Sequence, residues 1–397
     1  MPIRVVPFAA SCEVAVKEFN RRMAAAGSRW QFPQSCLPSW LAPGEGSPVF
    51  QEFFVATDGD AVRGAYALQH RPASLAGEEL PIGAWYLPIS EGTVDPTHAL
   101  VAAQLVRDAI RREPLSFGLG MDGMESALSK LVALLHCERR PVPFFVRVEH
   151  GTRVARQAGF LRQRAVLRRV LDVAAATGLA RLGAELAKRA LRRGPGLAGA
   201  SVEEVPEFGA WADALWERCR GRYSFVARRD AATLDRIYPK ERSRFERLRI
   251  SRAGQAIGWA VLQRAQLRRN RTYGSLHVGR ITDCLAAPEH AELVIRAATD
   301  SLASRGVELM LSNQLHPAWC AALRRNAFLS APSNYVFAPS ARLAERIRAG
   351  DPGWLGVHLN RGDGDGPWGD IRRGPWTDSD SDGGLASVKR GVRSWKR

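Results

Sequence analysis

A hairpin-and-strand pattern occurs twice in this chain, and this repeat constrains the fold more than any other feature. The stretch "GDAVRGAYALQ" at 59–69 returns as "GQAIGWAVLQ" at 254–263. Aligning Gly64 with Gly258 gives an offset of 194 residues (258 − 64). Self-similarity that preserves element order is better explained by duplication than by chance. The sequence therefore predicts two domains of similar fold.

The similarity continues downstream with a two-residue slip. Three pairs share an offset of 192: Pro96 with Pro288, His98 with His290, and Asp108 with Asp300. Within each copy, the apolar patterns predict three strands, a helix, a strand, a second helix and a closing strand. This order indicates an α+β fold, in which a mixed, mainly antiparallel sheet is flanked by helices.

The 397 residues are too many for one typical core, so we expect several segments. They are a first domain at 1–150, a basic amphipathic helical linker at 151–200, a second domain at 201–345, and a flexible, disordered tail at 346–397. The tail is assigned from low-complexity stretches such as "TDSDSDGG", and "NRGDGDGPWGD" is included in it because its aspartates do not match a calcium loop.

The net charge of +17 is concentrated in the linker, which carries eleven Lys and Arg residues against Asp172 and Glu185. Such a face can pack against the two domains, or meet an acidic acyl carrier protein or an anionic membrane surface. Nucleic acid is a less favoured partner. The six cysteines lack metal-ligand spacing, so we expect reduced thiols and no metal. Without a membrane-length apolar run or a signal-peptide pattern at the start, we expect a cytoplasmic protein.

The second copy carries residues that resemble a known family. They are the hairpin "GQAIGWAVLQ", the segment "LHVGRITDCLAAPEHAELVIRAATDSLASRGVELML" and the segment "SNQLHPAWCAALRRNAF". In order and type they resemble the GCN5-related N-acetyltransferase (GNAT) superfamily, here as a tandem pair. The resemblance covers roughly 45–150 and 200–340.

The resemblance implies that acyl-CoA, as acetyl-CoA or a longer acyl-CoA, enters a gap between two central strands that splay apart. Its pyrophosphate would lie on backbone N–H groups at the start of the following helix. In the second copy the corresponding residues are Leu285, Ala286, Ala287, Glu289 and His290, together with Asn313, which matches the asparagine ending the family's fifth strand. The family's glycine-rich loop is absent from both copies. Because Asn313 matches, the second copy is expected to hold the better site.

Acyl transfer needs a base for the acceptor and an acid for the leaving thiolate. The family often supplies the acid from a tyrosine, but Leu323 and Val132 stand at that place here. Asp283 is the candidate base and Tyr335 the candidate proton donor. Each has an alternative: Asp283 as a turn or capping residue, and Tyr335 as a core tyrosine with one hydrogen bond.

The leading hypothesis is an acyl-CoA-dependent N- or O-acyltransferase, in which a small-molecule, saccharide or peptide acceptor attacks the thioester directly in a ternary complex. Two alternatives remain open. One is a transferase resembling the FemABX type, which would use aminoacyl-tRNA and would suit a basic surface. The other is a non-catalytic pair of GNAT-like domains that acts as a binding or scaffold protein.

Overall fold

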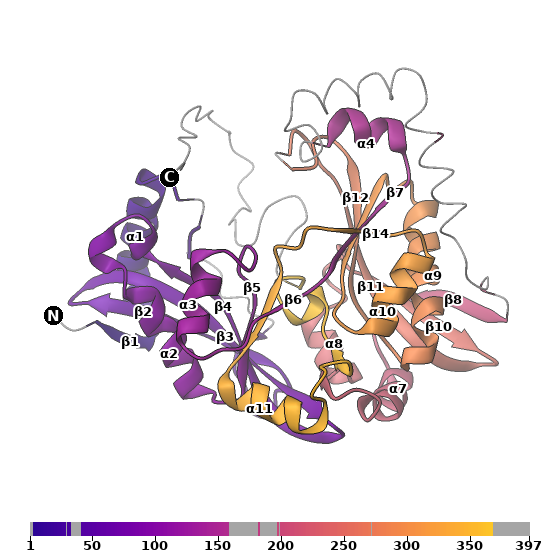
Figure 1. Ribbon diagram of the computed structural model, residues 1–397, viewed down its shortest axis with the longest axis horizontal. Helices are drawn as coiled ribbons and strands as arrows, with labels where there is room; N and C mark the ends of the chain where they lie inside the picture. The colour runs from indigo at the N-terminus through magenta and orange to yellow at the C-terminus, as the bar shows by residue number, and fades with distance from the viewer. Residues whose placement is uncertain are drawn as a thin grey trace.

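The structure is a computed structural model that describes residues 3–28, 30–32, 41–158, 182, 197, 199–270 and 272–367. Two mixed, mainly antiparallel sheets lie side by side, each flanked by helices (Figure 1). The predicted α+β architecture with two sheet domains is confirmed.

Within the described residues the first sheet has nine strands, seven of them in the order β1-β2-β3-β4-β5-β15-β6. They are β1 (Arg4–Pro7), β2 (Phe50–Asp58), β3 (Ala61–Leu75), β4 (Glu78–Ser90), β5 (Ser116–Gly120), β15 (Val336–Pro339) and β6 (Arg140–Pro141). Two short strands extend it from β3: β9 (Phe225–Ala227) pairs with β3, and β16 (Val357–His358) pairs with β9.

The second sheet, over the same described residues, has seven strands in the order β14-β7-β13-β12-β11-β10-β8. They are β14 (Leu329–Ala331), β7 (Phe144–Val148), β13 (Leu309–Asn313), β12 (His277–Ala286), β11 (Gln255–Gln266), β10 (Glu246–Arg252) and β8 (Ala200–Val205).

The helices cover the sheets in a similar way. Around the first sheet lie α1 (Glu13–Ala25), α2 (Val101–Arg112), α3 (Ala127–Leu134) and α11 (Ala341–Gly350). Around the second lie α4 (Gly151–Gln157), α7 (Ala210–Arg220), α8 (Ala231–Ile237), α9 (Ala291–Ser304) and α10 (Pro317–Arg325) (Figure 1). Short 3-10 turns precede or link them: η1 (Ala10–Cys12), η3 (Glu91–Thr93), η4 (Pro96–His98), η6 (Pro288–His290) and η7 (Arg361–Asp363).

The repeated glycine has the same role in both domains. Gly64 on β3 pairs with Ser90, and Gly258 on β11 pairs with Ala286. A Cβ atom at Gly64 would collide with Val101 of α2, and one at Gly258 would collide with Val294 of α9. A helix can pack this closely on the sheet only where the strand has no side chain. The repeated glycine therefore marks the same close contact between a helix and a strand in both domains.

The two sheets exchange strands, so they do not divide at the expected domain boundaries. Strand β7 comes from the first half of the chain, yet it pairs with β13 of the second sheet. Conversely, β15 comes from the second half and pairs with β5 of the first sheet. Figure 1 shows the two connecting segments crossing between the sheets. Each sheet is therefore completed by a strand from the other half.

The expectation of a flexible tail from residue 346 is wrong for 346–367. This stretch contains the end of α11, strand β16 and η7, and Asp363 within it is 1% exposed. We call residues 357–367 the C-terminal segment. It is ordered because its polar groups find buried partners on both sheets, which sequence composition does not reveal. Most of the basic linker (159–196, apart from 182) and residues 368–397 lie outside the described residues.

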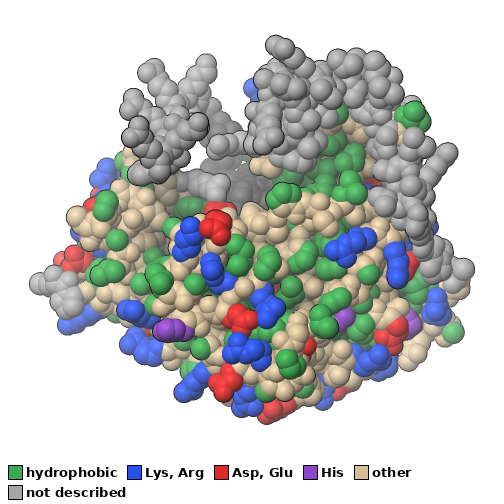
Figure 2. All heavy atoms as spheres, in the orientation of Figure 1, with side chains coloured by type: hydrophobic (Ala, Val, Ile, Leu, Met, Phe, Trp, Pro, Cys, Tyr) green, Lys and Arg blue, Asp and Glu red, His purple; other side chains and the backbone are tan. Residues whose placement is uncertain are grey.

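No described helix is long and apolar enough to cross a membrane. In the described part of the chain, no group of three or more His, Cys, Asp or Glu residues could hold a metal ion. On the face shown in Figure 2, Lys and Arg side chains are interspersed with Asp and Glu rather than gathered into one field.

Candidate active site

In the first sheet, two neighbouring parallel strands part after a short pairing. Strand β4 pairs with β5 only at 83–85 with 116–118, although β4 continues to Ser90. We call the region between residues 86–90 of β4 and the end of β5 the first splay. Beyond the pairing, β4 carries a bulge opposite Tyr66, where Leu87 adopts a left-handed φ of 49°. Among the described residues, the backbone of 86–89 forms no hydrogen bonds other than those to β3.

The helix end beside the first splay is suited to an anion. Helix α2 has no acidic residue in its first turn, so the positive end of its dipole is not neutralised there. Glu91 is buried in front of it and forms ion pairs with Arg22 (2.6 Å) and Arg63 (3.0 Å). Burial would raise the pKa of Glu91, but the two guanidinium groups outweigh it and lower the pKa. Glu91 therefore has two cationic partners, and Arg22 also lies 3.7 Å from Glu18.

The second sheet has a matching splay, but the chain itself fills it. Strand β12 pairs with β13 only at 278–281 with 309–312 and then continues to Ala286. We call this region the second splay. His358 Nε2 donates to the Cys284 carbonyl oxygen (2.9 Å), and the Leu315 N–H donates to the Leu359 carbonyl oxygen (3.0 Å). The C-terminal segment thus lies where the resemblance places acyl-CoA, with the His358 side chain on β12 and the Leu359 backbone on Leu315.

This arrangement is unfavourable for a donor at the second copy, where the sequence predicts the better site. Helix α9 also begins with an acidic residue, Glu292, in its first turn. The C-terminal segment packs so tightly that a Cβ atom at Gly362 would collide with the Asp283 side chain. A donor could occupy the second splay only after this segment had left it.

Asp283, the candidate base, is fully buried and already accepts four hydrogen bonds. Arg229 Nε (3.0 Å), Asn360 Nδ2 (2.9 Å) and the Cys284 N–H (2.8 Å) donate to Oδ1. The Tyr238 hydroxyl donates to Oδ2 (2.9 Å). An acceptor amine cannot reach a carboxylate that is 0% exposed and surrounded by donors. The geometry gives Asp283 the task of anchoring the C-terminal segment.

The anchor is a buried ion network that joins both sheets. Arg229 donates from Nη2 to both carboxylate oxygens of Asp363 (2.8 Å each) and pairs with Asp283. Arg71 on β3 lies 3.5 Å from Asp363, and all four side chains are at most 5% exposed. Burial would lower the pKa of Arg229, but Asp283 and Asp363 outweigh it and raise the pKa. Two arginines balance two aspartates.

Tyr335, the candidate proton donor, lies beside the first splay rather than the second, since β15 belongs to the first sheet. Its hydroxyl donates to Asp365 Oδ1 (2.5 Å) and accepts the Asp365 N–H (3.2 Å). Burial and Asp365 raise the pKa of Tyr335 well above its ordinary value. Burial would raise the pKa of Asp365, but Arg361 (2.9 Å), Arg280 and Tyr335 hold it low. The Asp365 side chain is 21% exposed.

The remaining predicted residues line the second splay and its loop. Asn313 is 1% exposed, and its Oδ1 accepts a long hydrogen bond from Arg361 (3.4 Å). Leu285 and Ala286 are buried, and the Ala286 carbonyl oxygen accepts a hydrogen bond from the Tyr223 hydroxyl (2.6 Å). Ala287 and His290 are partly exposed. Glu289 is exposed and forms an ion pair with Arg222. Their role in donor binding stays a prediction.

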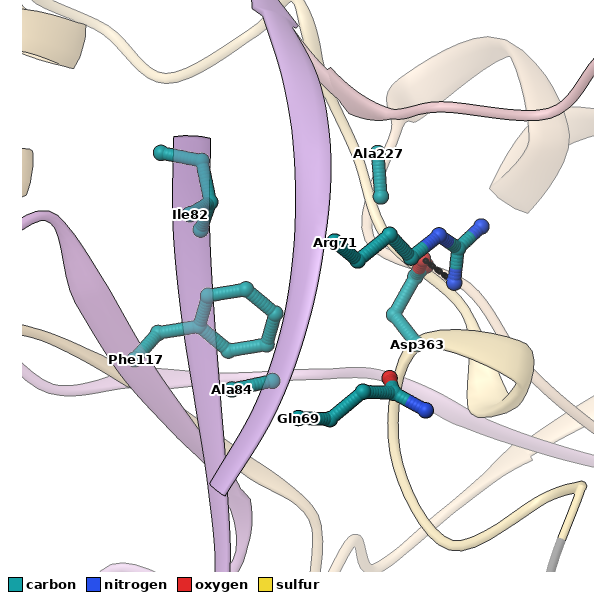
Figure 3. A pocket seen from close by; sticks show the side chains of 7 residues that line it. All are labelled: Gln69, Arg71, Ile82, Ala84, Phe117, Ala227 and Asp363. Atoms are coloured by element: carbon teal, nitrogen blue, oxygen red, sulfur yellow. Dashed lines mark ion pairs between the residues drawn. The ribbon is translucent and has the colours of Figure 1, made fainter. Parts of the chain in front are cut away.

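A small pocket lies at the point where β4 and β5 meet (Figure 3). Its lining residues are Gln69, Arg71, Ile82, Ala84, Phe117, Ala227 and Asp363. Figure 3 shows Asp363 reaching from the C-terminal segment toward Arg71, opposite the aromatic ring of Phe117. Its accessible space is about 10 Å³, which holds about one water molecule.

Sequence reasoning missed Arg71, Arg229, Asp363 and Asp365. A signal did exist in "NRGDGDG" (360–366), where small glycines alternate with charged residues. Glycine permits close backbone approach, and Gly362 and Gly364 both lie where a Cβ atom would collide with a neighbour. The partners come from positions 71, 229 and 283, so no local pattern connects them.

No protein-family model matches the sequence, and no match is found among the curated proteins. Among solved structures, the chain is similar to Saccharomyces cerevisiae N-myristoyltransferase with bound myristoyl-CoA, at 9% identity and a TM-score of 0.51, over 86% of this chain and 84% of that one. It is also similar to a GCN5-related N-acetyltransferase from Anabaena variabilis, at 10% identity and a TM-score of 0.50, over 86% and 73%. The predicted GNAT fold, present twice in one chain, is confirmed.

Proposed function

We propose that this protein, with two domains of the GNAT fold, is an acyl-CoA-dependent acyltransferase whose donor binds in the first splay. One observation carries the proposal: the edge of β4 at 86–89 has no described backbone partner, whereas the equivalent place on β12 is filled by the C-terminal segment. A pantetheine arm carries amide groups that can hydrogen-bond to such an edge in the manner of an added strand. The bound myristoyl-CoA of the similar S. cerevisiae enzyme supports a donor of this class.

The charges near the first splay support the same assignment. Pyrophosphate is held well at a helix start with unpaired N–H groups and no competing carboxylate. The first turn of α2 has no acidic residue, Asp95 caps the 3-10 turn η4 in front of it, and Arg22 and Arg63 pair with Glu91. At the second splay, Glu289 pairs with Arg222, and Glu292 stands in the first turn of α9 itself, where it pairs with Arg325.

In the reaction, the neutral acceptor amine attacks the thioester carbonyl carbon, the C–S bond breaks, and CoA leaves as a thiolate that is protonated by the proton the amine has lost. We assign Asp365 to accept the acceptor's proton, since it is ionised, partly exposed and fixed beside the first splay by Tyr335 and Arg361. A carboxylate with a low pKa is a weak base. It suffices for an amine, which becomes acidic once its nitrogen has attacked, but not for a hydroxyl. We therefore favour N-acylation.

The filled second splay supports a scaffold role for the second domain. It holds the C-terminal segment, and that segment presents Asp363 and Asp365 to the first sheet. The chain would then bind one donor molecule, and the scaffold hypothesis would apply to the second domain alone. The compartment, and an acidic carrier or anionic membrane as partner of 151–200, stay predictions.

Calorimetric titration of the full chain with acetyl-CoA tests the proposal. We expect one site per chain. Leu119 and Asn313 are equivalent positions, each one residue past its strand pairing (offset 194). Leu119→Trp should weaken binding at least about tenfold by filling the first splay, whereas Asn313→Ala should leave it unchanged. The opposite pattern, or no binding of acetyl-CoA, would contradict the proposal.

A further inference from the structure

The vertex of the first splay, where β4 and β5 come together at Trp85 and Gly118, limits the space for an acyl group. A donor lying along the splay carries its thioester toward this vertex. Beyond it the two strands are hydrogen-bonded, so an acyl chain cannot continue between them. It must turn onto one face of the sheet or the other.

The face covered by α2 and α3 is sealed by one aromatic side chain. Trp85 packs directly on Gly118, since a Cβ atom at Gly118 would collide with three atoms of the indole ring. Trp85 is 2% exposed and belongs to a core cluster with Leu105 of α2 and Val132 of α3. Close packing of this kind leaves no space for a methylene chain.

On the opposite face, the described residues form the small pocket of Figure 3. Ile82 and Phe117 form its apolar side, and Asp363 of the C-terminal segment closes it. Asp363 is held by two hydrogen bonds from Arg229 and by its ion pair with Arg71. A longer chain would have to separate these fully buried charges, which is strongly unfavourable.

We infer that this protein transfers a short acyl group of about two or three carbons, with Trp85 and the C-terminal segment as the residues that set this limit. An accessible space of about 10 Å³ takes about one group the size of a water molecule, which leaves no room for a long acyl chain. The inference rests on the proposed donor site in the first splay. It goes beyond that site by assigning chain-length selection to a segment that follows both copies of the repeat.

The test is a series of dissociation constants for CoA and for acetyl-, propionyl-, butyryl-, octanoyl- and myristoyl-CoA, measured by calorimetry on the full chain. We expect acetyl- and propionyl-CoA to bind within about twofold of each other, and octanoyl-CoA at least about tenfold more weakly than acetyl-CoA. Octanoyl- or myristoyl-CoA binding as tightly as acetyl-CoA would overturn the inference while leaving the donor site intact. Failure of all six to bind would overturn the proposed function itself.

A pair of variants tests which residues limit the length of the acyl chain. Ile82→Ala enlarges the pocket, so butyryl-CoA should gain at least about fivefold relative to acetyl-CoA. Ile281→Ala makes the same truncation at the vertex of the second splay and should leave the chain-length profile of the wild type. An unchanged profile in Ile82→Ala, with its thermal unfolding still cooperative, would show that the limit lies elsewhere.

Discussion

The two domains share a sheet, a helix packed on a glycine and a splay, yet they differ in what lies inside the splay. In the first domain the edge of β4 is left without a described backbone partner, whereas in the second the C-terminal segment occupies the equivalent place. The duplication explains the shared part. The difference comes from residues 357–367, which follow both copies of the repeat. On the proposed function, one of two similar sites serves as a scaffold although the repeat itself is shared.

The charged side chains at the two splays differ in their exposure to solvent. At the first splay, Arg22 and Arg63 are about one-quarter exposed, so water and ligands can reach them. At the second splay, Arg229, Asp283 and Asp363 are at most 1% exposed and satisfy one another. The two arginines at the first splay can therefore bind an anion from solution. The buried charges at the second splay instead connect the C-terminal segment to the sheets.

The largest expected effect concerns whether the two domains are independent at all. Because β7 and β15 are exchanged, fragments 1–158 and 199–367 each lack a strand of their own sheet. We expect neither fragment to unfold cooperatively alone, and co-expression to restore a complex that does, as measured by circular dichroism on heating. A cooperative transition in either fragment alone would contradict the exchange.

The next largest effect separates the buried charges from the accessible ones. Asp363→Ala leaves Arg229 facing one carboxylate instead of two in a fully buried place, so the free energy of unfolding should fall by about 3–5 kcal/mol. The matched change at the first splay, Glu91→Ala, should cost only about 1–2 kcal/mol, since Arg22 and Arg63 reach water. Urea unfolding measures both. Equal losses would remove the distinction.

The second domain should also be the more sensitive to acid near neutral pH. Burial lowers the pKa of His316 from 6.5 to about 4, and Asp351 opposes this only in part. The unfolded chain takes up this proton near pH 6.5 and the folded chain near pH 4. The stability contribution is therefore complete above pH 6.5 and is lost as the pH falls toward 4, by about 3 kcal/mol at most.

The matched variant for this effect is His316→Asn. His316 caps α10 by accepting the Ala318 N–H (3.1 Å), and asparagine can accept the same hydrogen bond without titrating. Unfolding free energies of the variant should change less between pH 7 and pH 5 than those of the wild type. Identical pH profiles would show that His316 does not contribute to the acid sensitivity.

The smallest expected effect concerns the arginines beside the starts of α2 and α9 and their contribution to acetyl-CoA affinity. Arg63→Gln removes one of two cations beside α2, so acetyl-CoA should bind about 3- to 10-fold more weakly, with a reduced dependence on salt. Arg222→Gln removes the exposed partner of Glu289 beside α9 and should change affinity less than twofold. Calorimetry at two salt concentrations distinguishes these outcomes, and a larger loss in Arg222→Gln would favour the second domain.

Sequence reasoning reached the architecture because the signals were local and occurred twice. Alternating apolar residues around β2, β3 and β4, and a glycine at the same place in each copy, were enough for the sheets and the fold resemblance. The sequence does not predict the strand exchange. Strands β7 and β15 both have the apolar pattern of a closing strand, and nothing in that pattern indicates which sheet each one joins.

The site was predicted less well for a related reason. Asp283 and Tyr335 do lie in the region between the sheets, but each is bonded to a residue of a segment whose composition predicts a flexible tail. Glycine and aspartate in "NRGDGDG" have the composition of a disordered stretch. They become ordered only because Arg71, Arg229 and Asp283, far apart in sequence, meet at one place.

We propose that the first splay binds the donor, whereas the second is filled by the chain itself. A crystal structure of the full protein with acetyl-CoA tests it most directly. The account predicts one CoA molecule along residues 86–90 of β4, with its pyrophosphate at the start of α2 and the C-terminal segment still bonded to Cys284. A CoA molecule along 282–286 of β12, with residues 357–367 displaced, would contradict it.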